Sequence, residues 1–114
     1  MANTFKRSTK SSLSTADVTT DAATNVLTAT GVSTLIIIGM VTANKTATSA
    51  TVDIYLKTPS DDSTYILRNA PVPAGSTLEY ISSSKLVITA GDVIRARSNT
   101  GSALDLTISY LEQS

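Results

Sequence analysis

The clearest structural signal in this 114-residue chain is the stretch SATVDIYLK, which covers residues 49–57. Its apolar and polar side chains alternate, with Val52, Ile54 and Leu56 on one face and Thr51, Asp53, Tyr55 and Lys57 on the other. Because successive side chains of a β-strand point to opposite faces, this period of two predicts a strand with one buried face. The same alternation recurs over residues 103–111.

Similar runs elsewhere in the chain predict about eight short strands in total. The expected strands cover residues 24–30, 33–43, 49–57, 64–69, 76–81, 85–89, 92–98 and 103–111. Turn formers such as Gly, Pro, Asp and Ser separate them at intervals of roughly 8 to 13 residues, which is typical of a sandwich or barrel. We therefore expect an all-β fold: an antiparallel, jelly-roll-like β-sandwich domain over residues 23–114, preceded by an extended N-terminal arm.

The expected arm, residues 1–22, is polar and basic, and its apolar residues are too sparse for a helical stripe. One interpretation is a frayed terminus. The other is an arm that becomes ordered against a neighbouring subunit, with Phe5 as its anchor and Lys6 and Arg7 beside it.

The stretch LIIIGMV at residues 35–41 departs from simple alternation, because both of its faces are apolar. On a regular strand, Ile36, Ile38 and Met40 share one face. The stretch fits a central strand covered on both sides within one subunit. Alternatively, the face with these three side chains packs against another subunit, because one face of each sheet in a two-layer sandwich normally meets water.

The composition excludes much of the chemistry that enzymes use. The chain contains no Cys, His or Trp, so a thiol nucleophile, a Ser–His–Asp triad and a His or Cys metal site cannot be built. Nine basic and nine acidic residues give zero net charge, which argues against a dedicated nucleic-acid binder. The longest apolar run, residues 35–41, is too short to cross a bilayer. We predict no catalytic residues, cofactor or metal, and neither nucleic acid nor membrane as a partner.

Two basic residues, Arg95 and Arg97, fall on the same face of an expected strand. They could form a basic stripe for phosphate groups. We favour pairing across the sheet with a residue such as Asp105, or with acids of a neighbouring subunit.

The C-terminal two thirds of the chain resembles small virion structural proteins of tailed bacteriophages, especially those of marine and cyanobacterial hosts. The similarity extends over roughly residues 24–112 and is carried by residues 48–56, 65–67, 72–78, 85–94 and 104–112. It implies a non-enzymatic β-sandwich subunit that is built into the virion in many copies.

We therefore expect a virion structural protein, either a capsid decoration or a neck or tail component. Its expected partners are copies of itself and other virion proteins. The hypothetical subunit interface comprises Phe5, Lys6, Arg7, Ile36, Ile38, Met40, Arg95 and Arg97. The alternative is a carbohydrate- or receptor-binding module of a tail fibre, in which Tyr55, Tyr65 and Tyr80 would present their rings to a glycan.

Overall fold

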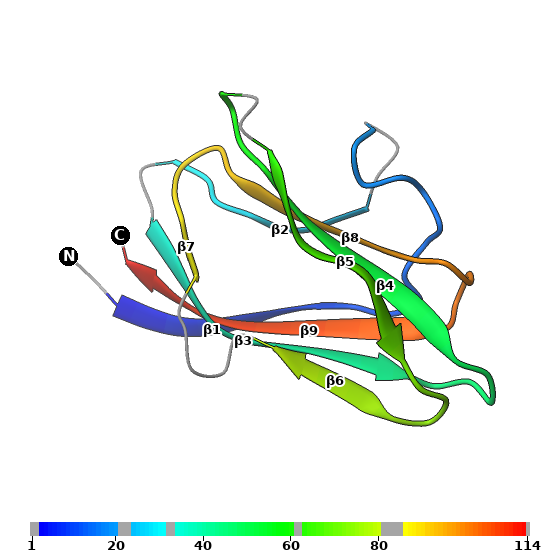
Figure 1. Ribbon diagram of the computed structural model, residues 1–114. Helices are drawn as coiled ribbons and strands as arrows, with labels where there is room; N and C mark the ends of the chain where they lie inside the picture. Colours follow the sequence, from blue (N-terminus) through cyan, green and yellow to red (C-terminus); the bar gives the residue numbers. More distant parts are fainter. Residues whose placement is uncertain (1–2, 21–23, 32–33, 61–62, 81–85, 114) are drawn as a thin grey trace.

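A computed structural model describes residues 3–20, 24–31, 34–60, 63–80 and 86–113. These residues form nine β-strands and no helix (Figure 1). The strands are β1 (Asn3–Lys10), β2 (Thr24–Thr28), β3 (Thr34–Asn44), β4 (Ala50–Lys57), β5 (Thr64–Val72), β6 (Thr77–Tyr80), β7 (Leu86–Ile88), β8 (Val93–Ser98) and β9 (Leu104–Gln113). The described residues thus contain no helix with the length and hydropathy to cross a membrane.

The strands form two antiparallel sheets that pack together, so the expected β-sandwich is confirmed. The five-stranded sheet has the order β1-β9-β3-β6. The strand β7 also pairs with β3, at residues 35–37, whereas β6 pairs with residues 40–43. The four-stranded sheet has the order β2-β8-β4-β5. The pairs are nested, since β1 joins β9, β2 joins β8, β3 joins β6 and β7, and β4 joins β5. This nesting across two sheets is the arrangement of a jelly roll.

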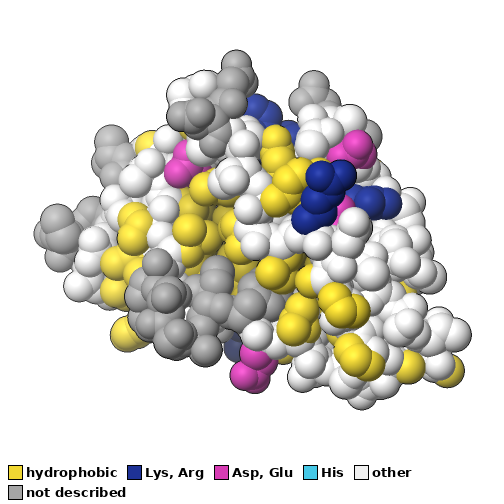
Figure 2. Space-filling model, in the orientation of Figure 1, with side chains coloured by type: hydrophobic (Ala, Val, Ile, Leu, Met, Phe, Trp, Pro, Cys, Tyr) yellow, Lys and Arg dark blue, Asp and Glu magenta, His cyan; other side chains and the backbone are white. Residues whose placement is uncertain are grey.

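The hydrophobic core lies between the sheets, on the faces that alternation predicts. Val52 and Ile54 of β4 are fully buried, and so are Leu104 and Ile108 of β9. Figure 2 looks onto the edge where β5, β6 and β7 lie, and hydrophobic side chains gather there between the two sheets. We call the core side of each sheet its inner face and the opposite side its outer face.

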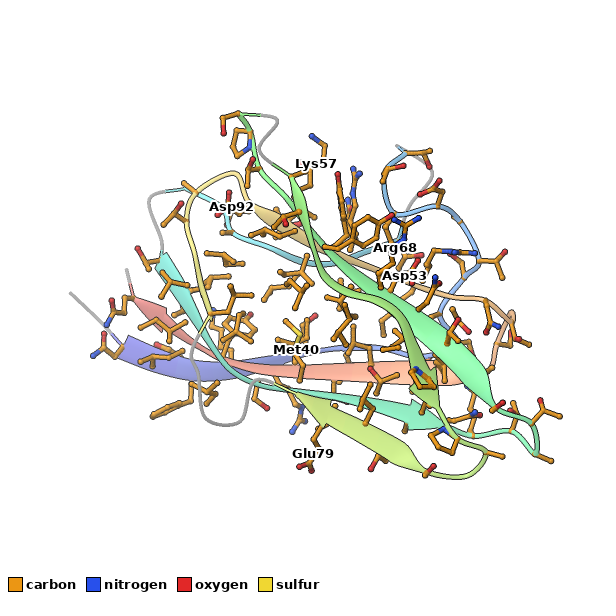
Figure 3. The ribbon with its side chains drawn as sticks, viewed as in Figure 1. Met40, Asp53, Lys57, Arg68, Glu79 and Asp92 are labelled. Atoms are coloured by element: carbon orange, nitrogen blue, oxygen red, sulfur yellow. The ribbon has the colours of Figure 1, made fainter. Side chains whose placement is uncertain are left out.

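A β-bulge changes the expected faces of β3. The register with β9 shifts between Ile37 and Gly39, so the alternation restarts beyond Ile38. Met40 consequently lies in the core with 1% of its surface exposed, and it points toward the four-stranded sheet in Figure 3. Its predicted place beside Ile36 and Ile38 on the outer face is therefore wrong. One inserted residue moves every later side chain of the strand to the opposite face of the sheet.

The N-terminal segment forms a strand that the hydrophobic pattern did not predict. Residues 3–10 form β1, which pairs along its length with β9 of the same chain. Nearly all of its side chains are exposed, so backbone hydrogen bonds rather than buried side chains hold it. Beyond it, Leu13 and Val18 are fully buried. The segment expected as an arm is thus extended, and it packs along its own sandwich.

Candidate assembly surface

The outer face of the five-stranded sheet carries a row of apolar side chains that crosses four strands. Phe5 of β1 is the register partner of Leu111 of β9, which is also opposite Ile36 of β3. Ile36 in turn is opposite Val87 of β7. We call these four residues the apolar row. Cross-strand partners share a face of the sheet, so their side chains lie next to one another.

The apolar row is open to solvent at both ends. Phe5 is 76% exposed and Val87 is 53% exposed, and these are the exposed large hydrophobic residues among those described. Leu111 and Ile36 are half-buried between them. A shallow depression beside the row is lined by Phe5, Lys6, Arg7, Ile38 and Ser109. Contiguous exposed apolar surface of this kind marks sites of protein interaction.

Two exposed charges flank the apolar row at opposite edges of the same outer face. Arg7 follows Phe5 by two residues on β1 and is opposite Ser109. Glu79 lies on β6 opposite Val41, and its side chain points away from the four-stranded sheet in Figure 3. Among the described residues, neither side chain has an ion-pair partner. Both charges are therefore available to a partner.

The structure separates the sequence-predicted interface residues into distinct groups. Phe5, Arg7 and Ile36 lie together on the outer face, with Ile38 beside them. Lys6 points the other way and forms an ion pair with Glu112 at 3.2 Å, which ties β1 to the end of β9. Sequence reasoning missed Leu111 and Val87, since only the strand pairing brings them next to Ile36.

Arg95 and Arg97 hold the N-terminal segment against the outer face of the four-stranded sheet. Arg95 is 6% exposed and donates hydrogen bonds to the Val18 carbonyl (3.2 Å) and to Oδ1 of Asn25 (3.0 Å). Arg97 donates to the Thr15 carbonyl (3.1 Å) and forms an ion pair with Asp53 (3.4 Å).

The predicted pairing across the sheet holds for Arg97, whose partner Asp53 lies opposite it on β4, but Asp105, the example expected, is a partner of neither arginine. The Asp105 carboxylate lies on the other sheet, where it accepts hydrogen bonds from Lys45 and the Ser12 backbone. The arginines instead pair with groups of their own sheet and of residues 15–18 that cover it. Alternation along a strand specifies the face of a side chain, but not the segment that lies over that face.

Two of the three tyrosines expected in a glycan site, Tyr55 and Tyr65, lie side by side on the outer face of the four-stranded sheet. The Tyr55 and Tyr65 rings meet edge to face with centroids 5.1 Å apart. The Arg68 guanidinium lies 5.0 Å from the centre of the Tyr65 ring. One face of that ring is therefore occupied by a cation–π contact. The Tyr80 side chain lies outside the described residues.

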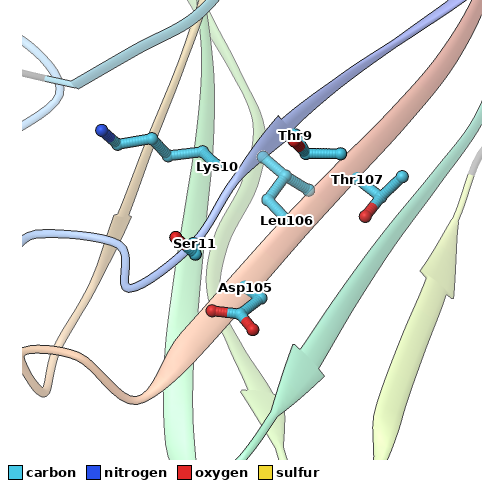
Figure 4. A pocket seen from close by; sticks show the side chains of 6 residues that line it. All are labelled: Thr9, Lys10, Ser11, Asp105, Leu106 and Thr107. Carbon is cyan, nitrogen blue, oxygen red and sulfur yellow. The ribbon is translucent and has the colours of Figure 1, made fainter.

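A second depression lies where β1 ends beside β9, and it is lined by Thr9, Lys10, Ser11, Asp105, Leu106 and Thr107 (Figure 4). The Lys10 side chain points away from Asp105 in this view. Within the described part of the chain, no three Asp, Glu, His or Cys side chains come close enough together to hold a metal ion. The depression is thus a polar hollow, whereas the apolar row offers a contact surface.

Comparison of the chain with protein-family models, with curated proteins and with solved structures finds no match.

Proposed function

We propose that this protein is a structural subunit of a tailed-bacteriophage virion and that it acts by multi-copy assembly without catalysis. The observation that carries the proposal is the apolar row, which leaves two large hydrophobic side chains, Phe5 and Val87, exposed on one face of an otherwise well-packed sandwich. Burial of exposed apolar surface is the main driving force for most protein association. The resemblance of residues 24–112 to small virion proteins supports the virion as the place where the protein assembles.

In this proposal the protein is a capsid decoration or a neck or tail component located in the virion. Its partners are further copies of the chain and other virion proteins. Neither a nucleic acid nor a membrane is a partner, and no cofactor is needed. A jelly roll with an open sheet face can contribute to a shell or tube by contact alone, since its remaining strands keep the subunit rigid.

Sedimentation of the full chain over a range of concentrations tests assembly, and electron microscopy of virions tests location. We expect concentration-dependent association that Phe5→Ser weakens. Tyr65→Ser is the matched control, because it removes an aromatic ring from the other sheet. A chain that stays monomeric at high concentration and is also absent from virions would contradict the proposal.

The second candidate, a glycan- or receptor-binding module, is favoured by the Tyr55–Tyr65 cluster. Aromatic rings beside polar groups are common in sugar-binding sites, but here Arg68 already covers one face of Tyr65. A glycan array distinguishes the candidates. Signal that is lost in Tyr55→Ala but kept in Phe5→Ser would support this module over the structural subunit.

A further inference from the structure

Building on the proposed function, we infer that a second copy of this chain covers the outer face of the five-stranded sheet. The two copies pack face to face about a two-fold axis that runs parallel to the strands, between β9 and β3. The inference rests on the positions of the apolar row and of the two flanking charges.

The apolar row is self-complementary about this axis. The four residues occupy successive strand positions in the order Phe5, Leu111, Ile36 and Val87. A two-fold rotation about the midline reverses that order. Phe5 of one copy then faces Val87 of the other, and Leu111 faces Ile36. The largest exposed ring thus meets a smaller branched side chain, and every apolar residue has an apolar partner, as an isologous interface requires.

Other orientations of the axis either mismatch the apolar row or leave most of the face uncovered. An axis across the strands at the middle of the sheet would place the apolar row against the cross-strand neighbours Asp105 and Ala43. That arrangement buries apolar side chains against a carboxylate. An axis across the strands through the row itself would leave most of the face uncovered, because the row lies near the ends of β1 and β9.

The charges support the same axis. Rotation brings Arg7, at the β1 edge of one copy, over the β6 edge of the other, where Glu79 lies. The two residues are offset by two positions along the strands, which is about 7 Å and within reach of two long side chains. Symmetry produces this pair twice. Opposite charges at the rim of an interface favour the correct orientation of the partners.

The size of the face fits a stable but modest dimer. Four strand positions about 4.8 Å apart and strands about 33 Å long give roughly 600 Å² per copy. Two copies would bury roughly 1,200 Å², which is at the lower end for specific interfaces. Many-copy assembly tolerates such modest contacts, because each subunit has several neighbours.

Charge reversal at the two flanking residues tests the inference sharply. Arg7→Glu alone places two carboxylates together twice in the dimer, and Glu79→Arg alone places two cations together twice. Each single variant should weaken self-association roughly tenfold at low salt. A one-to-one mixture of the two variants restores both opposite-charge pairs. We therefore expect mixed dimers with nearly wild-type affinity in analytical ultracentrifugation.

Lys57→Glu is the matched control, since it makes the same charge change as Arg7→Glu but on the four-stranded sheet. It should leave association unchanged, and all variants should keep the circular dichroism of the wild type. If the wild type associates but the mixture does not regain affinity, this dimer geometry is wrong although assembly itself stands. If the wild type is monomeric yet present in virions, the inference is also wrong, and another virion protein covers the face.

Discussion

The backbone N–H of Ser12 donates a hydrogen bond of 2.8 Å to Oδ1 of Asp105, although the two residues are 93 positions apart. Lys45 adds bonds to the same carboxylate oxygen (2.9 Å) and to the Ser12 hydroxyl (2.7 Å). Ser12 has a positive φ of 56°, which only a well-supported non-glycine residue adopts. Asp105 thus fixes the point where the chain leaves β1 and crosses to the four-stranded sheet.

Acid should loosen this crossing point. The Ser12 N–H, and next the Lys45 side chain, hold the pKa of Asp105 below its usual value. The unfolded chain therefore binds the proton more readily, and stability rises with pH. The contribution is fully present above about pH 4 and is lost as the pH falls below that value. Urea unfolding between pH 6 and pH 3 measures it.

Asp105→Asn should reduce this acid dependence and lower the stability at neutral pH. Some dependence should remain, because hydrogen bonds from Thr19 also lower the pKa of Asp17. An Asp105→Asn variant with the acid profile of the wild type would show that the Ser12 bond does not support the crossing point.

Because of the bulge in β3, shortening two nearby side chains to alanine should lower the free energy of unfolding by different amounts. Met40 is in the core, so Met40→Ala should leave a cavity and cost about 2–4 kcal/mol of unfolding free energy. Ile38 lies on the outer face, so Ile38→Ala should cost less than about 1 kcal/mol. Chemical denaturation of both variants checks the order. Similar small costs for the two variants would mean that the strand has no bulge, because Ile38 and Met40 share one face of a regular strand.

The sequence predicts strands well where one face is buried and the pairing is regular. Alternation over residues 49–57 and 103–111 assigned the inner faces of β4 and β9 correctly. It failed at Met40, because a bulge is specified by strand pairing and only Gly39 hinted at it. It missed β1, because an edge strand with exposed side chains has no apolar pattern.

For a related reason, the sequence indicated only two of the four residues of the apolar row. Phe5 and Ile36 stand out as apolar residues in unusual places, but Val87 and Leu111 read as ordinary strand residues. Their grouping depends on the registers of β7 and β9 with β3. Those registers link positions dozens of residues apart, which local periodicity does not encode.

Loss of the Arg95 guanidinium should detach the N-terminal segment from the four-stranded sheet. Arg95→Ala leaves the Val18 carbonyl and the Asn25 side chain without their donor, at a cost of about 2–3 kcal/mol. Arg68→Ala is the control, because Arg68 is exposed and lies over the Tyr65 ring, a contact worth about 0.5–1 kcal/mol. It acts on residues 14–20 only through its charge, which is the smallest of the influences that lower the pKa of Asp17. Urea unfolding and limited proteolysis within residues 14–20 measure both effects. Equal protease sensitivity of the two variants would contradict the role of Arg95.

Two N-terminal truncations should behave differently. Deletion of residues 1–10 removes β1 with Phe5 and Arg7, so the chain should fold but associate weakly. Deletion of residues 1–20 also removes the fully buried Leu13 and Val18. Each such side chain contributes about 1.5–3 kcal/mol, and together they rival the stability of a small domain. Circular dichroism should show the longer deletion largely unfolded. A folded product would mean that these two side chains are not essential to the core.

Gly91 should be far less replaceable than Gly75, although both have positive φ, at 92° and 66°. A Cβ on Gly91 would lie 2.6 Å from Cγ of Pro59, whereas one on Gly75 would meet open space. Gly75→Ala should therefore cost about 1–2 kcal/mol from backbone strain alone. Gly91→Ala adds overpacking against a rigid ring, worth about 1–3 kcal/mol more. Urea denaturation of the two variants compares them directly. Equal costs would show that the turn bearing Pro59 shifts freely, and that its packing on Gly91 does not hold the loops at this end of the sandwich together.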